Sequence, residues 1–410
     1  MQPKTVTSTP VTPSTDTLVN PAPPSKSHKK LFLWLLTILI ILVIAGLGAW
    51  YWYGHQSKKA NNAAVSSTVN SVKSIQASNN NTVVIKYINL PTGTSYAKTA
   101  QTNYLYIDSS SYSNSSSTGL GGKLIYNGQT VYTGSDLVTG GGGYVISQNG
   151  LHYAYMKYDN STANIYVDNK LVQSVPNQAS SSAVTLYAVS NNGQDYAYGY
   201  AVPTSQSSSV FAIFKDGKQI FQNPSTIFTV EFSEDLSNYV SSVQIPTGSN
   251  GNVTDDIIKD GTNEGSGNQA FISPDGSQYI SLANNSSGTS GTVSVDGKSV
   301  GTVTEVNGGG DSTVINNNGS YAFTDYANHL VNINGTTNTI PTTIPDKCGT
   351  GCVNLFAVNQ DATHYIVGDN KSVGGNVAVW YLDGKSVTLN GNVVGLEFNN
   401  NTLYVYVSSD

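Results

Sequence analysis

The chain has 410 residues, enough for a large hydrophobic core, but only 11% of its residues are charged. All 19 basic residues are lysine, and the sequence contains no arginine. Because bidentate recognition of phosphates and guanine bases normally uses arginine, this composition argues against a nucleic-acid-binding protein. Residues 83–410 carry 12 lysines against 24 aspartates and glutamates, which argues further against nucleic acid or an anionic membrane surface as the main partner.

The N-terminal part of the chain contains one long apolar segment. Residues 1–30 are rich in Pro, Ser and Thr, and we expect them to form a disordered tail. Leu31–Tyr53 then holds 23 residues without a charge, enough for a helix to span about 30 Å of hydrocarbon. Trp34 near one end and the aromatic run at residues 50–53 match the two interfacial belts of a membrane helix. We therefore predict a single transmembrane helix.

The lysines around this segment predict its orientation. Lys26, Lys29 and Lys30 precede it, whereas Lys58 and Lys59 follow it. This excess favours a cytoplasmic N-terminus and an extracytoplasmic C-terminal domain anchored in the cell membrane.

Two other interpretations of the apolar segment compete with a membrane helix. A cleaved signal peptide has a shorter apolar run nearer the N-terminus, and a buried core helix is rarely apolar on every side. After the segment, residues 54–82 have the composition of a stalk, in which Ala63–Ile75 would fit a short helix.

A repeat fills the remainder, residues 83–410. Its units align on a tyrosine that follows a tight turn, with spacings of 39–44 residues between consecutive tyrosines. The aligned tyrosines are Tyr153, Tyr196, Tyr239, Tyr279, Tyr321, Tyr365 and Tyr404, and Tyr104 is a further candidate. Each alternating run that begins at these tyrosines is followed in most units by a second hairpin with an Asn-Gly or Asp-Gly turn, as in Asp296-Gly297.

Four short strands in a repeat of this length predict a β-propeller blade, with an elongated array of separate hairpins as the alternative, and the fold class is all-β. Seven second hairpins give seven blades. We expect the C-terminal hairpin Val394–Val407 to join the hairpin Lys123–Thr133 in one closing blade. If Val83–Asp108 is a true inner hairpin, the number of blades rises to eight.

The best-preserved unit shows a family resemblance. Ser273-Pro274-Asp275-Gly276, followed by Gln278-Tyr279-Ile280, is similar to the motif of TolB-like and WD-repeat-like propellers. The resemblance covers residues 83–410, although the other units match the motif only in part. It implies a propeller with a binding or scaffolding role. Some members of the family carry a hydrolase domain, for which we expect no room before Asp410.

Few residues suggest specific chemistry. Cys348 and Cys352 are the only cysteines, and in an exported domain we expect them to form a local disulfide rather than half of a zinc site. His152 and His364 occupy equivalent positions before the aligned tyrosines, where they would be exposed strand residues or, if the two units converge, metal ligands.

Two further segments have structural and functional alternatives. The stretch Asp255–Glu264 carries oxygen ligands of the kind that calcium takes, but its spacing does not match a twelve-residue calcium loop, which favours a solvated acidic hairpin. The glycine run Gly140–Gly143 lacks the residues of a phosphate loop and is typical of a flexible connection. Asn-x-Ser/Thr sequences at Asn160, Asn252, Asn318 and Asn334 would matter only in a source that glycosylates them.

We expect from these observations a membrane-anchored module that binds a protein or a glycan at the cell surface. No catalytic constellation is evident, so we expect no enzymatic activity, no cofactor and no catalytic or metal-binding residues. An enzyme or a metal-dependent site at the central channel is one alternative, and a structural envelope protein is another. Local function should lie where the units differ, at the insertions Pro203–Ser209, Gly248–Asp256 and Thr336–Cys352 and in the loops around the glycine run.

Overall fold

The computed structural model describes most of the C-terminal part of the chain. The described residues are 69–76, 82–90, 98–100, 102–108, 120–139, 142–159, 162–176, 184–204, 209–246, 253–285, 290–304, 313–325, 327–340, 353–370 and 379–408. Across these ranges no helix has the length and apolar character needed to cross a membrane. The predicted tail 1–30, the predicted membrane helix Leu31–Tyr53 and the cysteine pair Cys348 and Cys352 lie outside the described residues.

The described residues form 32 β-strands and no helix. The first sixteen are β1 (Val69–Gln76), β2 (Thr82–Leu90), β3 (Lys98–Ala100), β4 (Asn103–Asp108), β5 (Leu120–Tyr126), β6 (Gln129–Val138), β7 (Tyr144–Ile146), β8 (Tyr153–Asp159), β9 (Thr162–Val167), β10 (Lys170–Pro176), β11 (Thr185–Val189), β12 (Tyr196–Pro203), β13 (Ser209–Lys215), β14 (Lys218–Asn223), β15 (Ile227–Phe232) and β16 (Tyr239–Pro246). The others are β17 (Val253–Lys259), β18 (Thr262–Ser266), β19 (Gln269–Ile272), β20 (Tyr279–Asn284), β21 (Ser290–Val295), β22 (Lys298–Thr304), β23 (Thr313–Ile315), β24 (Tyr321–Asp325), β25 (Leu330–Ile333), β26 (Thr336–Thr339), β27 (Val353–Val358), β28 (Tyr365–Asn370), β29 (Val379–Leu382), β30 (Lys385–Val387), β31 (Asn392–Asn399) and β32 (Thr402–Ser408).

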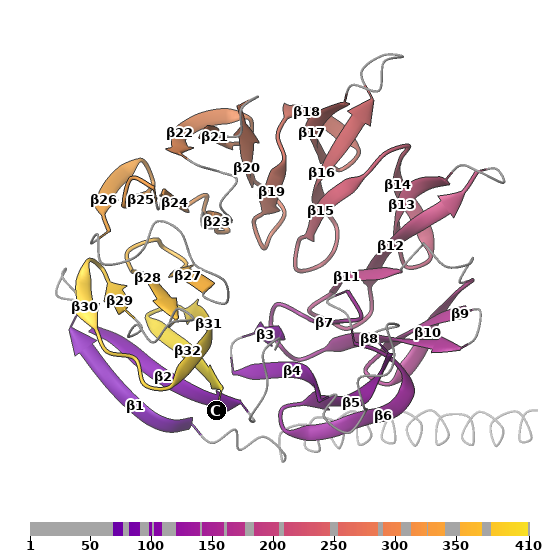
Figure 1. The fold of residues 1–410 in the computed structure, drawn as a ribbon, viewed down its shortest axis with the longest axis horizontal. Helices are drawn as coiled ribbons and strands as arrows, with labels where there is room; N and C mark the ends of the chain where they lie inside the picture. Colours follow the sequence, from indigo (N-terminus) through magenta and orange to yellow (C-terminus); the bar gives the residue numbers. More distant parts are fainter. Residues whose placement is uncertain are drawn as a thin grey trace, which may run out of the picture. The chain divides into compact units, whose positions relative to one another are not determined.

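Most of these strands form sheets of four consecutive antiparallel strands, as Figure 1 shows for β19–β22. Strands β11–β30 make five such sheets in chain order. An eight-stranded sheet holds β3–β10, and its two halves, β3–β6 and β7–β10, meet through one residue pair, Leu137 with Lys157. Repeated four-stranded antiparallel units are the architecture of a β-propeller, so the predicted all-β fold class is confirmed.

The last sheet is built from both ends of the described chain. Its strand order is β1-β2-β32-β31, and the indigo and yellow strands lie side by side in Figure 1. Strand β2 pairs in parallel with β32, from Val84 opposite Thr402 to Leu90 opposite Ser408. The described strands therefore begin at Val69, inside the segment 54–82 for which we expected a stalk.

Two expectations are corrected by this sheet. Strand β1 includes Val69–Ile75, the larger part of the segment to which we assigned a short helix. The C-terminal hairpin is completed by β2 and β1, whereas residues 123–133 lie in β5 and β6, of which β5 pairs with β4. The physical reason is the apolar alternation of β2, which buries Val83, Ile85 and Tyr87 completely or nearly so.

Side chains of this closing sheet pack against both neighbouring sheets. On one side, Ile85 and Leu403 belong to a cluster that includes Trp380 of β29. On the other side, Ile88 and Tyr406 belong to a cluster with strands β4 and β5. The hydrophobic core is thus continuous from the last sheet to the first through the N-terminal hairpin.

The tyrosine register is explained by one recurring hydrogen bond. In seven sets of four strands within the described chain, the backbone N–H of the aligned tyrosine donates to the side-chain Oδ1 of an Asn or Asp at the second turn, at 2.8–3.1 Å. The pairs are Tyr104–Asn127, Tyr153–Asp168, Tyr196–Asp216, Tyr239–Asp260, Tyr279–Asp296, Tyr321–Asn334 and Tyr365–Asp383. Each of these Asn or Asp residues has φ of 46–50°, a region that both residue types tolerate. Tyr104 is therefore a member of the register.

Candidate functional site

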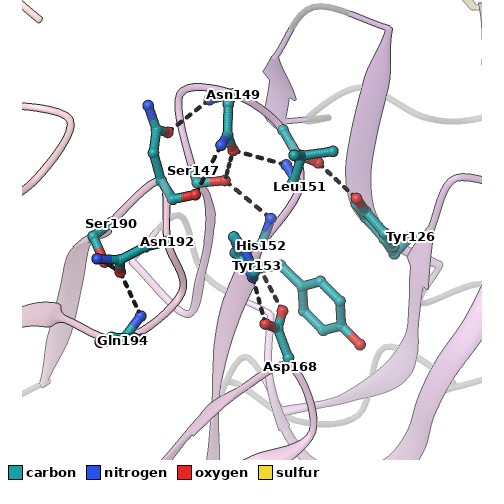
Figure 2. Close-up of polar contacts among 12 residues, drawn as sticks. Tyr126, Ser147, Asn149, Leu151, His152, Tyr153, Asp168, Ser190, Asn192 and Gln194 are labelled. Carbon is teal, nitrogen blue, oxygen red and sulfur yellow. Dashed lines mark hydrogen bonds and ion pairs between the residues drawn. The ribbon is translucent and has the colours of Figure 1, made fainter. Parts of the chain in front are cut away.

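The first turns of the sets share a buried serine. Ser147, Ser190, Ser233 and Ser273 are at most 1% exposed. Each hydroxyl donates to the Asn or Asp side chain two residues later, at 2.7–2.8 Å, and accepts the N–H five residues later, at 3.0 Å. Figure 2 shows this arrangement at Ser147, Asn149 and His152. These bonds satisfy the polar groups of a tight turn, so the Ser-Pro-Asp-Gly motif is a structural device.

Successive first turns also bond to one another, and we call this series of contacts the turn belt. Its hydrogen bonds run from Asn149 N–H to Asn191 Oδ1 (2.8 Å), from Asn191 N–H to Glu234 O (2.9 Å), from Glu234 N–H to Pro274 O (2.7 Å) and from Asp275 N–H to Asn317 Oδ1 (2.7 Å). Because each bond joins a different pair of sheets, the belt fixes the spacing of the turns on this face of the domain.

The turns surround a cavity of about 420 Å³, which we call the central cavity. Its walls come from seven of the eight sets of four strands in the described chain. The lining residues are Thr99, Ala100, Ile146, Ser147, Gln148, Glu234, Pro274, Asn316, Asn317, Val358, Gln360, Glu397, Phe398, Asn399 and Asn400. Residues that are as much as 301 positions apart in the chain, from Thr99 to Asn400, therefore meet at one hollow.

The central cavity is polar and carries negative charge. Glu234 and Glu397 are its two carboxylates, and no lysine lines it. Each carboxylate accepts a hydrogen bond through Oε2, Glu234 from Asn191 Nδ2 and Glu397 from the Tyr406 hydroxyl, both at 2.9 Å. Held in this way, the two carboxylates favour a ligand that carries a positive charge and hydrogen-bond donors.

A third carboxylate lies on the inner strand that leads to Glu234. Glu231 of β15 is accessible to solvent, yet it is closely surrounded by protein. This desolvation raises the pKa of Glu231 to about 7, although the positive charge of Lys98 opposes the shift. The raised pKa moves the protonation of Glu231 toward neutral pH, which its sequence context gave no reason to expect.

The two aligned histidines do not converge on a common metal ion. His152 Nδ1 lies 2.6 Å from Asp168 Oδ2, as Figure 2 shows, and His364 Nδ1 lies 2.8 Å from Asp383 Oδ2. Each histidine thus contacts the same aspartate that holds the neighbouring tyrosine. His364 is completely buried, which corrects the expectation that this position is an exposed strand residue.

The acidic stretch Asp255–Glu264 lies in the hairpin of β17 and β18, as the structural interpretation predicted. Asp260 accepts the Tyr239 N–H, and Asp256 accepts a bond from Asn263 Nδ2 at 2.7 Å. Within the described residues no group of three or more His, Cys, Asp or Glu side chains is arranged to hold a metal ion.

The other predicted sites are described only in part. Asn318 and Asn334 lie in tight turns, whereas Asn160 and Asn252 lie outside the described residues, as do Gly140 and Gly141 of the glycine run. Most of the three insertions also lies outside them.

Sequence reasoning named the central channel as one possible place for a site but missed the residues that line the central cavity. Most of its lining residues are turn residues of ordinary type, which do not mark a site within one unit. The one signal in the sequence was the carboxylate Glu234, which stands where the other first turns carry Gln, Asn or Pro.

Comparisons with known proteins concern the fold. No protein-family model matches the chain, and no curated protein matches it. The chain is similar to an acylaminoacyl peptidase, with 14% identity, a TM-score of 0.40 and coverage of 73% of this chain and 52% of that one. It is similar to the β-propeller domain of the Trilobed protease from Pyrococcus furiosus, with 12% identity, a TM-score of 0.38 and coverage of 73% and 95%. TolB from Acinetobacter baumannii matches with 12% identity, a TM-score of 0.29 and coverage of 50% and 49%.

These likenesses are too low to carry a functional argument, and the chain spans about half the length of the acylaminoacyl peptidase. They do correct one expectation. We expected a protein that is not an enzyme, and this expectation is contradicted because two of these matched proteins are peptidases.

Proposed function

We propose that the chain is a membrane-anchored, extracytoplasmic β-propeller that binds a protein partner at its central cavity. We assign it eight blades, one for each set of four strands, with the last blade closed by β1 and β2. The apolar segment Leu31–Tyr53 and the lysines around it support the anchoring and the orientation.

The observation that carries the proposal is the convergence of seven strand sets on one hollow of about 420 Å³. A hollow of this size accommodates one or two side chains of a partner, and turns held by the turn belt need little reorganisation on binding. The charge of Glu234 and Glu397 supports a partner segment that presents a lysine or an arginine.

A photo-crosslinking experiment in intact cells tests this proposal. The full chain would carry a photoreactive residue at Gln148, on the wall of the cavity, or at Leu171, an exposed residue on the outer strand β10. We expect a discrete protein adduct from position 148 that is lost when Glu234 and Glu397 are both replaced by lysine. Adducts that are equal from positions 148 and 171, or that survive the double replacement, would refute binding at the cavity.

Protease accessibility tests the orientation separately. Protease added to intact cells should digest the chain beyond Lys59 and spare residues 1–30. The reverse pattern would contradict the assigned topology without bearing on the cavity.

A further inference from the structure

A second hollow lies beside the central cavity, and we call it the amide hollow. It measures about 560 Å³ and is bounded by three first turns, at residues 316–319, 359–362 and 399–401. Its lining residues are all Asn, Gln or Asp: Asn317, Asn318, Asn359, Gln360, Asp361, Asn400 and Asn401. It shares Asn317, Gln360 and Asn400 with the central cavity, so the two hollows are contiguous.

The amide hollow lies where the turn belt stops. From Asn149 to Asn317, successive first turns are joined by direct hydrogen bonds near their tips. Beyond Asn317 the contacts lie deeper, because Asn316 Nδ2 bonds to the Asn359 carbonyl (3.0 Å) and Asn359 Nδ2 bonds to Asn401 Oδ1 (3.3 Å). Asn359 is 1% exposed and forms the floor, and within the described residues no hydrogen bond joins the turn tips at Asn317, Gln360 and Asn400.

The tips keep much of their hydrogen-bonding capacity. Gln360 occupies the place that Asn191 and Glu234 hold in the belt, but its exposed amide makes no hydrogen bond within the described residues. Asn317 and Asn318 use their Oδ1 atoms to accept the N–H groups of Asp275 and Ser320. Their amide NH₂ groups point to no partner in the described chain. The hollow therefore offers several donors and acceptors at fixed positions.

The charge and polarity of the lining limit the chemistry of a ligand. No lysine lines the hollow, which disfavours an anion, and its single carboxylate, Asp361, already accepts two hydrogen bonds from Thr363. No apolar side chain lines it, so it does not suit the hydrophobic anchor of a protein partner. A ligand that is uncharged and rich in groups that both donate and accept hydrogen bonds remains.

We propose that the amide hollow binds a neutral oligosaccharide. A sugar hydroxyl donates and accepts at once, and a primary amide offers a matching donor and acceptor in one plane. The adjoining central cavity is lined in part by the half-buried Phe398, which offers an apolar surface to a sugar ring that extends into that cavity. This inference concerns a second site and does not depend on the protein partner proposed for the central cavity.

Titration calorimetry of the full chain with neutral hexasaccharides of glucose, mannose and N-acetylglucosamine tests the inference. At least one should bind, and Gln360→Ala combined with Asn318→Ala should weaken binding by about tenfold or more, the loss of one or two neutral hydrogen bonds. Gln194→Ala is the matched control, because Gln194 is an exposed amide of another first turn and lies outside both hollows. The Gln194→Ala variant should bind the hexasaccharide with wild-type affinity, and all variants should have the wild-type melting temperature.

Three outcomes would overturn the inference. One is the absence of binding by every hexasaccharide at millimolar concentration. Another is binding that the double replacement leaves unchanged. The third is equal or tighter binding of a tetraserine peptide, which would assign the hollow to polypeptide. The double variant Glu234→Gln, Glu397→Gln should leave saccharide affinity unchanged. A failure of the proposed protein binding at the central cavity can therefore be distinguished from a failure of saccharide binding at the amide hollow.

Discussion

Replacement of Asp296 tests whether the bond between the second turn and the tyrosine stabilises each unit. Asp296 Oδ1 accepts the Tyr279 N–H at 3.0 Å, and its backbone has φ of 46°. In Asp296→Ala the Tyr279 N–H loses its acceptor, which costs about 1–2 kcal/mol. Alanine in the left-handed region costs about 1–2 kcal/mol more. The expected loss of unfolding free energy is therefore about 2–4 kcal/mol.

Asp296→Asn is the matched control for this change. Asparagine keeps the Oδ1 acceptor and tolerates the positive φ, and Asn127 and Asn334 already fill the equivalent position in two other units. We expect Asp296→Asn to change the unfolding free energy by less than about 1 kcal/mol. The surface contact from Gln278 Nε2 to Asp296 Oδ2 is exposed and adds little to either variant.

Urea unfolding of the detergent-solubilised full chain, followed by far-ultraviolet circular dichroism, measures both variants. An Asp296→Asn variant that loses as much stability as Asp296→Ala would refute the reasoning, since it would assign the effect to charge. So would an Asp296→Ala variant that unfolds at the wild-type midpoint. Asp383→Ala should cost more than Asp296→Ala, because it also leaves the buried His364 Nδ1 without its carboxylate.

Three other changes test the closing sheet, the raised pKa of Glu231 and the first turn. Ile85→Ala, in the core of β2, should cost about 2–5 kcal/mol in urea unfolding, while the exposed Thr82→Ala should be neutral; equal effects would contradict closure by β2. Because the pKa of Glu231 is raised, the folded state binds more protons than the unfolded state between pH 4.5 and about 7, so the stability of the wild type should fall as pH rises through that interval. Glu231→Gln should remove this fall. If the melting temperature of the variant has the same slope against pH as that of the wild type, the reasoning is refuted. Gly150→Ala should lower the melting temperature more than Gly297→Ala. Both glycines have φ near +70°, but only at Gly150 would an added Cβ lie 2.6 Å from a backbone oxygen, that of Ala100. Equal effects of the two replacements would show that this close approach is relieved at no cost.

The repeat unit could be predicted from sequence because its determinants are local. A tight turn needs residues that tolerate positive φ, and a strand with one buried face needs alternation, so both leave a readable pattern. The register Tyr279 to Asp296 spans 17 residues and recurs, with changes of length, in the other units that have a second hairpin. The all-β class and the position of each second turn therefore followed from the sequence alone.

The closing sheet could not be predicted in the same way. Strand β2 carries the apolar alternation of a strand, but its partner β32 is more than 300 residues away, and nothing in either segment specifies the parallel register of Val84 with Thr402. We assigned the partner by counting hairpins, which placed the C-terminal hairpin beside residues 123–133 instead of beside β2. Pairing between distant segments depends on which exposed edge remains when the other sheets have formed.

The candidate sites show the same division. The amino-acid sequence determined that Asn, Asp and Gly occupy the turns, since turn geometry is a property of a few consecutive residues. Only the tertiary structure decided that Glu234 and Glu397 face one central cavity, and that the turn belt is broken between Asn317 and Gln360. Those relations join separate sheets, and their distances are set by the packing of whole sheets against one another, which no single repeat records.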